Sequence, residues 1–477
     1  MATDRDRIKS RPRPRPGDEL CLTVDRLAYE GAAVGRCEGL VVFAWGAAPG
    51  ETVRVRVRRV ERRHVEADVI AVEQASPERV APRCVHFNQG CGGCSWQHVN
   101  YASQLHAKET AVRDSLERLG GLRNLPLRPI IAAPDPWCYR NKMEFAFHPD
   151  GVLGLHPRGA WHSILPLAEC FLAQPLTVTL VKAAQDLARE ASLSLHDPRT
   201  HSGLLRELIV RHSRGTGETM IGIVTSPGPF DAAAAMAERL AAVDPSVVSV
   251  VRSIRASFDT SAPLQQTSLL RGQDHITETV GGLHFAIGAE TFFQTNSAQA
   301  ERLVAMVREL AGDVAGALAI DLYCGVGMFT LALSSAGAKA VGIELSASSI
   351  EAARANARSN GLGETLFFAG DARSVLPQVL ADHGPPRVVV LDPPRAGAGG
   401  KVMRRIARSA PERIIYVSCN PTTLARDLGQ LEPFGYRVAL VQPLDLFPQT
   451  YHVETVVVLD RHADLATSAT PPTPEEA

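Results

Sequence analysis

The second half of the chain alternates short, apolar, β-branched runs with helix-forming stretches, and this alternation constrains the fold more than any other feature. The runs that predict strands are residues 317–322, 340–345, 365–369, 388–391 and 414–417. Strands that alternate with helices predict a parallel, doubly wound α/β sheet. Two closing runs, 437–441 and 452–459, are expected to extend one edge of this sheet. We assign residues 286–462 to this domain.

The amino-terminal part is basic and predicts a small barrel. Residues 1–15 form an Arg-Pro-rich arm. Residues 16–76 contain short alternating runs, 20–27, 40–45 and 53–60, separated by Gly and Pro, which are typical of an OB-like β-barrel. Residues 1–65 hold fourteen Arg and Lys against nine Asp and Glu. In residues 53–58 valine alternates with arginine, so three valines are expected to face a core and three arginines to face outward. This favours contact with a nucleic-acid backbone over an ordinary solvated strand face.

The central part of the chain, residues 77–285, predicts a mixed α+β domain. Within it, residues 98–119 predict an amphipathic helix with an apolar stripe of Tyr101, Leu105, Val112, Leu116 and Leu119, and packing on the carboxyl-terminal domain is one option for that stripe. The aromatic and basic residues in 135–147 suit either base stacking beside phosphates or a half-buried strand. Residues 463–477 are rich in Pro and Glu and predict a disordered tail.

Length and composition point to a cytoplasmic protein of two or three domains. The chain has 477 residues, is 45% hydrophobic and 21% charged, and contains no apolar run of membrane-spanning length and no export signal. Its nine cysteines are an odd number and unevenly spaced, which favours metal or catalytic thiols over a disulfide framework. We expect no membrane partner, and no obligate protein partner is evident.

Cys419 is a candidate nucleophile because it follows the apolar run 414–417 and precedes a helix that opens at Pro421. Ligands of open parallel sheets bind outside the carboxyl ends of the strands, where this thiol is expected to lie. The helix opening directs backbone N–H groups toward the sulfur and is expected to favour the thiolate. The alternative for a lone cysteine is a small buried hydrophobic side chain.

Several acids lie where a nucleotide-like cofactor would bind. Residues 321–329 run from a strand through a glycine turn into a helix, and Glu344 ends the next strand, where it can accept hydrogen bonds from ribose hydroxyls. Asp371 follows the third strand and is a candidate for an adenine amino group. Asp392 follows the fourth strand, before two prolines that fix a rigid loop. A nicotinamide site shares part of this pattern, but the third glycine is missing, so a mononucleoside cofactor fits better.

Cys84, Cys91 and Cys94 form a C-x6-C-x2-C cluster that suits a metal. Three ligands need a fourth, for which Cys138 and Cys170 are candidates. Zinc with His86 or His98 as a ligand is the alternative to an iron–sulfur cluster.

Five motifs in order resemble the S-adenosylmethionine-dependent RNA uracil-5-methyltransferases, especially the bacterial 23S ribosomal RNA branch with a TRAM domain. They are residues 292–296, 321–327, 392–397, 418–423 and 452–455, and the resemblance spans about 16–460. It implies a Rossmann-like methyltransferase domain. It also implies roles for individual residues: the methyl donor is contacted by Gln294, Tyr323, Glu344 and Asp392; Cys419 is the nucleophile; Glu454 is the general base; Cys170 completes a 4Fe-4S site with Cys84, Cys91 and Cys94.

The expected activity is methylation of carbon 5 of a specific uridine, with RNA as the partner and ribosomal RNA favoured over transfer RNA. The resemblance supplies the reason, because bacterial tRNA relatives generally lack the barrel and the cluster. Met328 departs from the family pattern, in which some relatives carry a polar residue near the cofactor. The alternatives are a tRNA uridine methyltransferase and a non-catalytic, redox-responsive RNA-binding protein, against which the intact Cys419, Glu454 and Asp392 argue.

Overall fold

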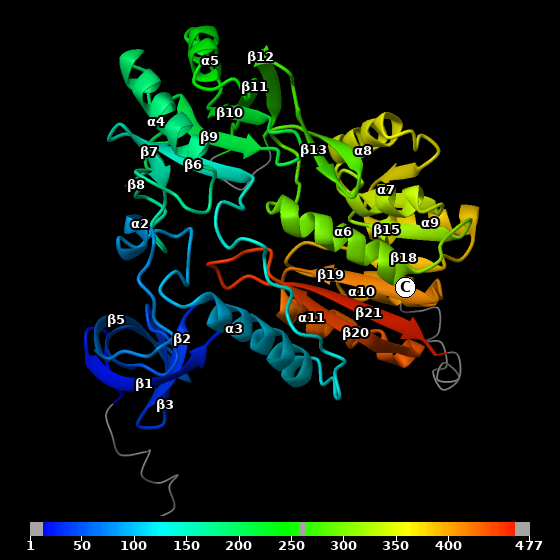
Figure 1. Ribbon diagram of the computed structural model, residues 1–477, viewed down its shortest axis with the longest axis horizontal. Coiled ribbons are helices and arrows are strands. Elements are labelled where there is room, and N and C mark those ends of the chain that lie inside the picture. The colour runs from blue at the N-terminus through cyan, green and yellow to red at the C-terminus, as the bar shows by residue number, and fades with distance from the viewer. Residues whose placement is uncertain (1–12, 258, 260–263, 463–477) are drawn as a thin grey trace, which may run out of the picture. The chain divides into compact units, whose positions relative to one another are not determined.

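The computed structural model describes residues 13–257, 259 and 264–462 (Figure 1). The chain divides into two compact units. The first contains the chain up to Ala111 together with Phe447–His452, and the second contains Val112–Leu446 and the chain from Val453 onward. In the part of the chain that the structure describes, no helix has the length and apolar character needed to cross a membrane.

The first unit contains the predicted barrel, which is confirmed. Its strands close in the order β1-β2-β3-β5-β4. They are β1 Glu19–Leu27, β2 Ala33–Cys37, β3 Leu40–Trp45, β4 Thr52–Val60 and β5 His64–Gln74. The sequence runs predicted β1, β3 and β4 but not β2 or β5. Gly35 lets β2 approach β1 closely, because a Cβ on it would lie 2.2 Å from the carbonyl oxygen of Thr23.

Strand β4 has the predicted alternation, but its arginines already have anionic partners. The three valines are buried in the barrel core: Val53, Val55 and Val57. Arg56 pairs with Glu19 across β1 at 3.1 Å, and Arg58 pairs with Glu66 of β5 at 2.9 Å. Arg54 lies between Glu19 and Glu73, at 3.9 and 3.2 Å. Glutamates on both neighbouring strands neutralise these arginines, so the alternation in 53–58 is explained within the barrel and does not by itself favour a nucleic-acid backbone.

Two helices follow the barrel, α2 Val85–Asn88 and α3 Tyr101–Asp114, and α3 continues as a π turn over Ser115–Leu119. Val112 and Leu116 are fully buried in the core of the second unit. Leu119 is 65% exposed, so its place in the predicted apolar stripe is wrong. The cause is the π turn, whose wider hydrogen-bonding spacing rotates the last residues away from the α-helical face.

The amino-terminal half of the second unit is built on a sheet whose described strands run in the order β12-β11-β10-β9-β6-β7-β8. These strands are β6 Lys142–His148, β7 Val152–Leu155, β8 Leu165–Pro166, β9 Leu205–His212, β10 Thr219–Thr225, β11 Val247–Ile254 and β12 Gln266–Gly272. Helices α4 Pro175–Glu190 and α5 Ala233–Ala241 contribute buried side chains to its core. Phe145 and Phe147 belong to this core, so these two aromatic residues of the 135–147 cluster are strand residues and not stacking platforms. A hairpin, β13 Ile276–Val280 and β14 Leu283–Ile287, follows.

The carboxyl-terminal half has the predicted doubly wound fold, which is confirmed. Its described strands are ordered β17-β16-β15-β18-β19-β21-β20. They are β15 Leu318–Leu322, β16 Lys339–Glu344, β17 Leu366–Ala369, β18 Val388–Leu391, β19 Arg413–Ser418, β20 Tyr436–Leu444 and β21 Glu454–Arg461. The first five are parallel, and β21 and β20 extend one edge in antiparallel fashion.

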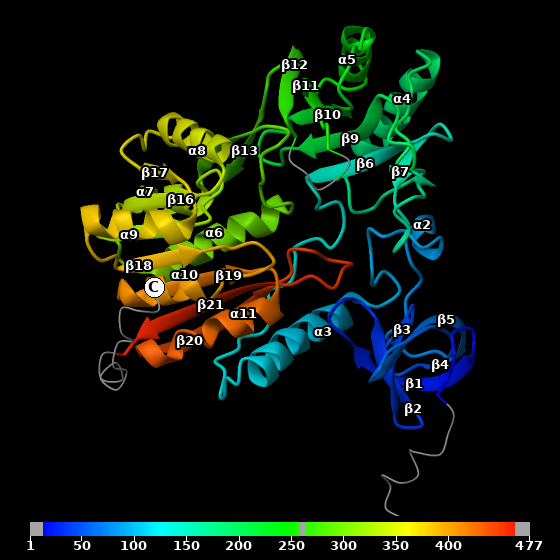
Figure 2. The same cartoon turned by 180° about the vertical axis from the view of Figure 1, so that it is seen from behind.

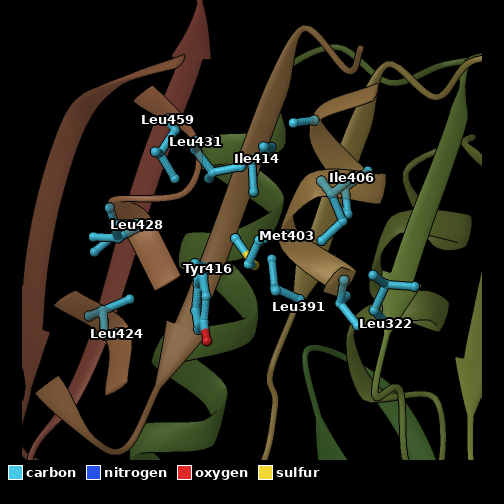
Figure 3. Packing of buried hydrophobic residues seen from close by; sticks show 14 of the residues in the cluster. Leu322, Leu391, Met403, Ile406, Ile414, Tyr416, Leu424, Leu428, Leu431 and Leu459 are labelled. Atoms are coloured by element: carbon cyan, nitrogen blue, oxygen red, sulfur yellow. The ribbon is translucent and has the colours of Figure 1, made fainter. Parts of the chain in front are cut away.

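Helices cover both faces of this sheet (Figure 2). They are α6 Ser297–Ala311, α7 Met328–Ser335, α8 Ala347–Ser359, α9 Ala372–His383, α10 Gly400–Arg408 and α11 Pro421–Leu428. All four residues of β18 are buried, as expected for a parallel strand covered on both sides. Figure 3 shows Met403 and Ile406 of α10 and Leu424 and Leu428 of α11 packing around Tyr416 and Ile414 of β19.

The outer edge of β20 is covered by the chain before the central sheet. The backbone N–H of Arg128 donates to the carbonyl oxygen of Val441 at 2.9 Å, and that of Ile131 donates to Pro443 at 3.0 Å. An uncovered edge strand is a template for pairing with another chain, so this segment closes the sheet at that side.

Candidate active site

Strand register brings three predicted site residues to one edge of the catalytic sheet. Leu391 pairs with Tyr416, and Ser418 pairs with Thr455 of the antiparallel β21. Asp392 and Cys419 therefore follow the carboxyl ends of adjacent strands, and Glu454 begins β21 at the same end. This is the edge at which open α/β sheets bind ligands.

Cys419 is half-buried between β19 and α11, and its surroundings keep it protonated. Burial, followed by the charges of Glu454 and Asp392, raises the pKa of Cys419 to about 11. Arg395 acts in the opposite direction as a hydrogen-bond donor and a positive charge. The predicted preference for thiolate is therefore wrong for the ligand-free protein, because desolvation and two nearby acids outweigh the helix opening at Pro421.

Glu454 is a buried acid with unused hydrogen-bonding capacity. Its exposed fraction is 2%, and Oε1 has no hydrogen-bond partner within the described residues. Burial, followed by the charge of Asp392, raises the pKa of Glu454 well above its usual range, and Arg395 opposes this. Buried carboxyl groups without partners are rare in stable folds and are found where a ligand or reaction needs them.

Asp392 is joined to Gln294 across the sheet edge. Nε2 of Gln294 donates to Oδ2 of Asp392 at 3.3 Å, and burial raises the pKa of Asp392 to about 7. The backbone of Gln294 is fixed by Asn141, whose Nδ2 donates to the Gln294 carbonyl oxygen at 2.9 Å. Asn296, two residues later, caps α6 and donates to the carbonyl oxygen of Leu446 at 3.1 Å.

The turn after β15 forms a cradle at the same edge. Tyr323 has a positive φ of 63°, which an ordinary side chain adopts only under constraint, and its N–H donates to Ile343 at 2.8 Å. Gly325 has φ 54°, and a Cβ on it would meet no atom within 4 Å. Its N–H donates to Oε2 of Glu344 at 3.2 Å. An open glycine beside an acid at the end of the second strand fits a nucleoside-bearing methyl donor in shape and chemistry.

Two further acids differ in their availability. Asp321 is 1% exposed, accepts a 2.6 Å hydrogen bond from Oγ1 of Thr330, and has its pKa raised to about 7 by burial. Asp371 is held at the start of α9 by Arg373, whose Nε lies 2.9 Å from Oδ1, and this hydrogen bond lowers the pKa of Asp371 to about 2. The predicted contact of Asp371 with adenine would compete with this pair.

A buried acid on α11, which the sequence analysis did not identify, positions the loop after Asp392. Oδ2 of Asp427 accepts from the Tyr416 hydroxyl at 2.8 Å and from the N–H of Ala398 at 2.8 Å. Gly397 is needed here, because a Cβ on it would lie 2.5 Å from the same oxygen. Arg395 lies within the motif 392–397 but was not singled out there, and Asp427 stands in no motif that marks it.

The cysteine motif lies in the first unit around α2. Cys84 is buried before that helix, Cys91 and Cys94 are half-buried, and Nε2 of Gln97 donates to Sγ of Cys94 at 3.1 Å. Within the described residues no group of three or more His, Cys, Asp or Glu side chains is arranged to hold a metal ion. Cys170 lies half-buried in the second unit. Soft thiols with N–H donors suit an iron–sulfur cluster in their chemistry.

Each histidine proposed as a zinc ligand has one ring nitrogen engaged, while Nδ1 of His98 has no partner among the described residues. The ring of His98 is buried against the carbonyl oxygen of Ala47, with Nε2 at 3.0 Å, and burial lowers the pKa of His98 to about 4. Nδ1 of His86 lies 2.9 Å from Oε1 of Gln89. These contacts leave the choice between an all-cysteine ligand set and zinc with histidine to metal analysis.

Comparison with known proteins agrees with this geometry. Residues 263–369 and 379–462 match the family described as tRNA (Uracil-5-)-methyltransferase, and residues 14–70 match the TRAM domain. An uncharacterised RNA methyltransferase of Chlorobaculum tepidum is 38% identical over 472 residues, covering 94% of this chain and 98% of the relative. One of Nitratidesulfovibrio vulgaris is 39% identical over 452 residues, covering 93% and 96%.

A solved structure extends the likeness to three dimensions. The tRNA (uracil-54, C5)-methyltransferase of Pyrococcus abyssi, in complex with S-adenosyl-L-homocysteine, superposes with a TM-score of 0.74 and 29% identity, covering 92% of this chain and 99% of that chain. The predicted enzyme class and methyl donor are thereby confirmed. The chain belongs to the S-adenosylmethionine-dependent RNA uracil-5-methyltransferase family and carries a TRAM domain.

Proposed function

We propose that this enzyme methylates carbon 5 of a specific uridine in ribosomal RNA through a covalent adduct between Cys419 and carbon 6 of the ring. The observation that carries the proposal is the strand register that sets Cys419 beside the orphan carboxyl of Glu454, one strand from Asp392. A nucleophile, a base and an orienting acid are the three groups that this substitution needs.

The first step is addition of the Cys419 sulfur to the pyrimidine. Carbon 5 of uracil is a weak nucleophile until a thiolate adds to carbon 6 and generates an enolate. Arg395 lowers the pKa of Cys419 and is positioned to stabilise the thiolate. The methyl donor supplies an electrophilic sulfonium methyl group, and Gln294, Tyr323, Glu344 and Asp392 are the residues proposed to hold it.

The last step is removal of the hydrogen from carbon 5, which lets the sulfur leave and restores the ring. Glu454 is the proposed base, because its buried Oε1 has no partner within the described residues. The carboxylate form has to be present at this step, so Arg395, which opposes the raised pKa of Glu454, assists both the nucleophile and the base.

Two variants test the nucleophile. Cys419→Ala is expected to abolish release of tritium from 5-tritiated uridine RNA and covalent trapping by 5-fluorouridine RNA. Cys21→Ala, which removes an exposed barrel thiol, is the matched control and is expected to retain both. An active Cys419→Ala enzyme would end the assignment.

Transfer RNA is a second candidate substrate, and a specific observation favours it. The Pyrococcus abyssi tRNA enzyme covers 92% of this chain, so a barrel at the amino terminus does not by itself separate the two substrates. The preference for ribosomal RNA rests on the resemblance to the bacterial branch that combines a barrel with a cysteine cluster. Mapping 5-methyluridine in both RNA classes from cells with and without this protein decides between them.

We also propose that Cys84, Cys91, Cys94 and Cys170 hold a 4Fe-4S cluster with a structural role. The all-cysteine donor set and the N–H donor from Gln97 to Cys94 support it. Protein purified anaerobically is expected to contain iron and acid-labile sulfide at about four atoms each per chain, which follows from the cluster type. Stoichiometric zinc without sulfide would refute the cluster.

A further inference from the structure

A series of hydrogen bonds connects Glu278, a buried acid of the hairpin strand β13, to the edge of the catalytic sheet. Oγ of Ser297 donates to Oε2 of Glu278 at 2.6 Å. Nδ2 of Asn141 donates to Oγ of Ser297 and to the carbonyl oxygen of Gln294, each at 2.9 Å. Nε2 of Gln294 in turn donates to Asp392. These residues all belong to the second unit, and no step of the proposed reaction uses Glu278.

The backbone around Glu278 holds its carboxyl group in one orientation. The residue is 1% exposed, and its oxygens accept from Oγ of Ser213 at 3.2 Å and from the N–H groups of Arg214 at 3.1 Å, Gly215 at 2.7 Å and Thr279 at 3.1 Å. Gly215 is needed here, because a Cβ on it would lie 2.9 Å from Oε1 of Glu278. Since these donors are neutral, Glu278 acts in this network as a fixed acceptor for the hydroxyl group of Ser297.

The chemistry of the groups fixes the direction of each hydrogen bond. An amide nitrogen only donates and a carbonyl oxygen only accepts, so Nδ2 of Asn141 has to face Gln294, and the flipped amide would set two oxygens against each other. Nδ2 carries two N–H bonds, one for each of its acceptors. The hydroxyl of Ser297 gives its only proton to Glu278 and keeps its lone pairs for Asn141. Each member of the network therefore orients the next.

The backbone of Asn141 ties this network to the central sheet. The N–H of His212, at the end of β9, donates to the carbonyl oxygen of Asn141 at 2.8 Å, and the N–H of Asn141 donates to that of Thr295 at 2.9 Å. Both contacts survive loss of the Asn141 side chain. Asn141 and Ser297 also line a cavity of about 530 Å³. Water entering from this cavity can satisfy the carbonyl oxygen of Gln294, but it cannot hold that backbone in place.

We propose that Asn141 is a positioning residue for the methyl donor. Together with Ser297 and Glu278 it fixes the backbone of Gln294, so that the side chain of Gln294 stays beside Asp392. The central sheet thus shapes the donor site through Asn141, which acts on the donor only by way of Gln294. The inference rests on the proposed role of Gln294 as a donor contact and adds the residues that hold it.

The first test is a double-mutant cycle on the binding of S-adenosyl-L-homocysteine, measured by calorimetry with full-length protein and no RNA. Gln294→Ala is expected to weaken binding about tenfold and Asn141→Ala about fivefold, as for the loss of a hydrogen bond. Because Asn141 acts through Gln294, the double variant is expected to bind like Gln294→Ala, whereas independent effects would give about fiftyfold. Gln174→Ala is the control and is expected to bind like wild type, because Gln174 lines the same cavity and donates to the carbonyl oxygen of Cys138 at 2.7 Å.

The outcomes of this cycle separate the inference from the function on which it rests. Independent effects of the two substitutions would overturn the positioning role alone. Wild-type affinity in Gln294→Ala would overturn the donor contact of Gln294 and the inference with it. Urea denaturation supplies the remaining check: if the affinity lost in Asn141→Ala followed a loss of folded protein, Asn141 would have a structural role only and the proposal would fail.

The second test assigns the far end of the network. Ser297→Ala removes the acceptor that orients Asn141, so it is expected to weaken binding of S-adenosyl-L-homocysteine about threefold, with no further loss when combined with Asn141→Ala. Ser103→Ala is the matched control, because Ser103 also lies in the first turn of a helix and donates to a side-chain oxygen, Oδ1 of Asn100, at 3.0 Å. Wild-type affinity in Ser297→Ala, or a further loss in the double variant, would contradict the part assigned to Ser297 and Glu278.

Discussion

At the scale of single residues, the protonation of Cys419 decides how the site works. The thiol stands before α11, whose opening favours an anion, but burial and the acids Glu454 and Asp392 favour the neutral form. The second influence wins in the ligand-free protein. The proposed nucleophile is therefore held mostly as a thiol in the ligand-free protein, which protects it from reaction with other electrophiles.

The rate of Cys419 alkylation by iodoacetamide is expected to rise with pH. Because the pKa of Cys419 is raised to about 11, the thiolate fraction below that value grows about tenfold per pH unit. Between pH 7 and 9 the rate, followed by mass spectrometry of the Cys419 peptide, is expected to rise about a hundredfold. A rate that levels off near pH 7 would show that the thiol has an ordinary or lowered pKa.

Glu454→Gln is expected to have two opposite effects. Once Glu454 is ionised its charge raises the pKa of Cys419, so removing the acid is expected to make alkylation of Cys419 several-fold faster at alkaline pH. Without the base, hydrogen cannot leave carbon 5, so methylated RNA is expected to remain attached to the protein on a denaturing gel. Glu432→Gln, at an exposed acid before β20, is the control. Normal turnover by Glu454→Gln would exclude it as the base.

At the scale of elements, hydrophobic periodicity predicted the strands and helices whose form depends on local sequence, and it missed those that depend on long-range packing. The five parallel strands of the catalytic sheet were predicted within one residue, because a buried parallel strand is a short apolar run between turns, whereas β20 extends three residues beyond its predicted end. β2 and β5 were missed, since their residues alternate weakly and are fixed by barrel closure. The π turn after α3, which packs against α11, was also missed, because no local signal in the sequence marks it.

The site shows the same division. The positions of Cys419 and Asp392 follow from strand ends that the sequence reveals. The pKa of Cys419 was predicted in the wrong direction, because burial by residues distant in sequence cannot be read from a motif. Asp427 was not predicted at all, since one acid in a short helix has no distinguishing pattern.

Asp427→Asn is expected to loosen the loop after Asp392. The amide places at most one acceptor against donors from Tyr416 and Ala398, so the free energy of unfolding is expected to fall by about 2–3 kcal/mol. Because Asp427 positions the loop, kcat is expected to fall more than KM rises. Urea denaturation and steady-state methylation measure these effects, with the exposed Asp382→Asn as control. Unchanged kinetics would limit Asp427 to a structural role.

At the scale of the whole molecule, the first unit is completed by a segment from the other end of the chain. Phe447–His452, the connection between β20 and β21, belongs to the unit that holds the barrel. Gln104, 1% exposed, fixes it: its Oε1 accepts from the N–H of Gln449 at 3.0 Å and its Nε2 donates to Oε1 of Gln449 at 3.0 Å. Glu454 follows this segment after one residue.

Gln104→Leu is expected to lower methylation although Gln104 has no part in the proposed reaction. The substitution leaves the buried N–H of Gln449 unpaired, at a cost of about 1–3 kcal/mol, and frees the segment that leads into Glu454. The elimination step should suffer most, so covalent RNA adduct is expected to accumulate relative to product. Gln74→Leu, at the exposed end of β5, is the control. An adduct-to-product ratio equal to that of wild type would refute this coupling.

The shared segment also limits how the protein can be taken apart. Suppose the barrel and its neighbouring residues were replaced by those of a distant homologue. Phe447–His452 would then pack against residues that it does not match, two positions before Glu454. Domain exchange is therefore expected to give active protein only when the amino-terminal residues and Phe447–His452 are exchanged together. Recombination that exchanges only one of them is expected to give inactive chimeras. The interleaved chain thus makes the barrel and the methyltransferase domain a single heritable unit.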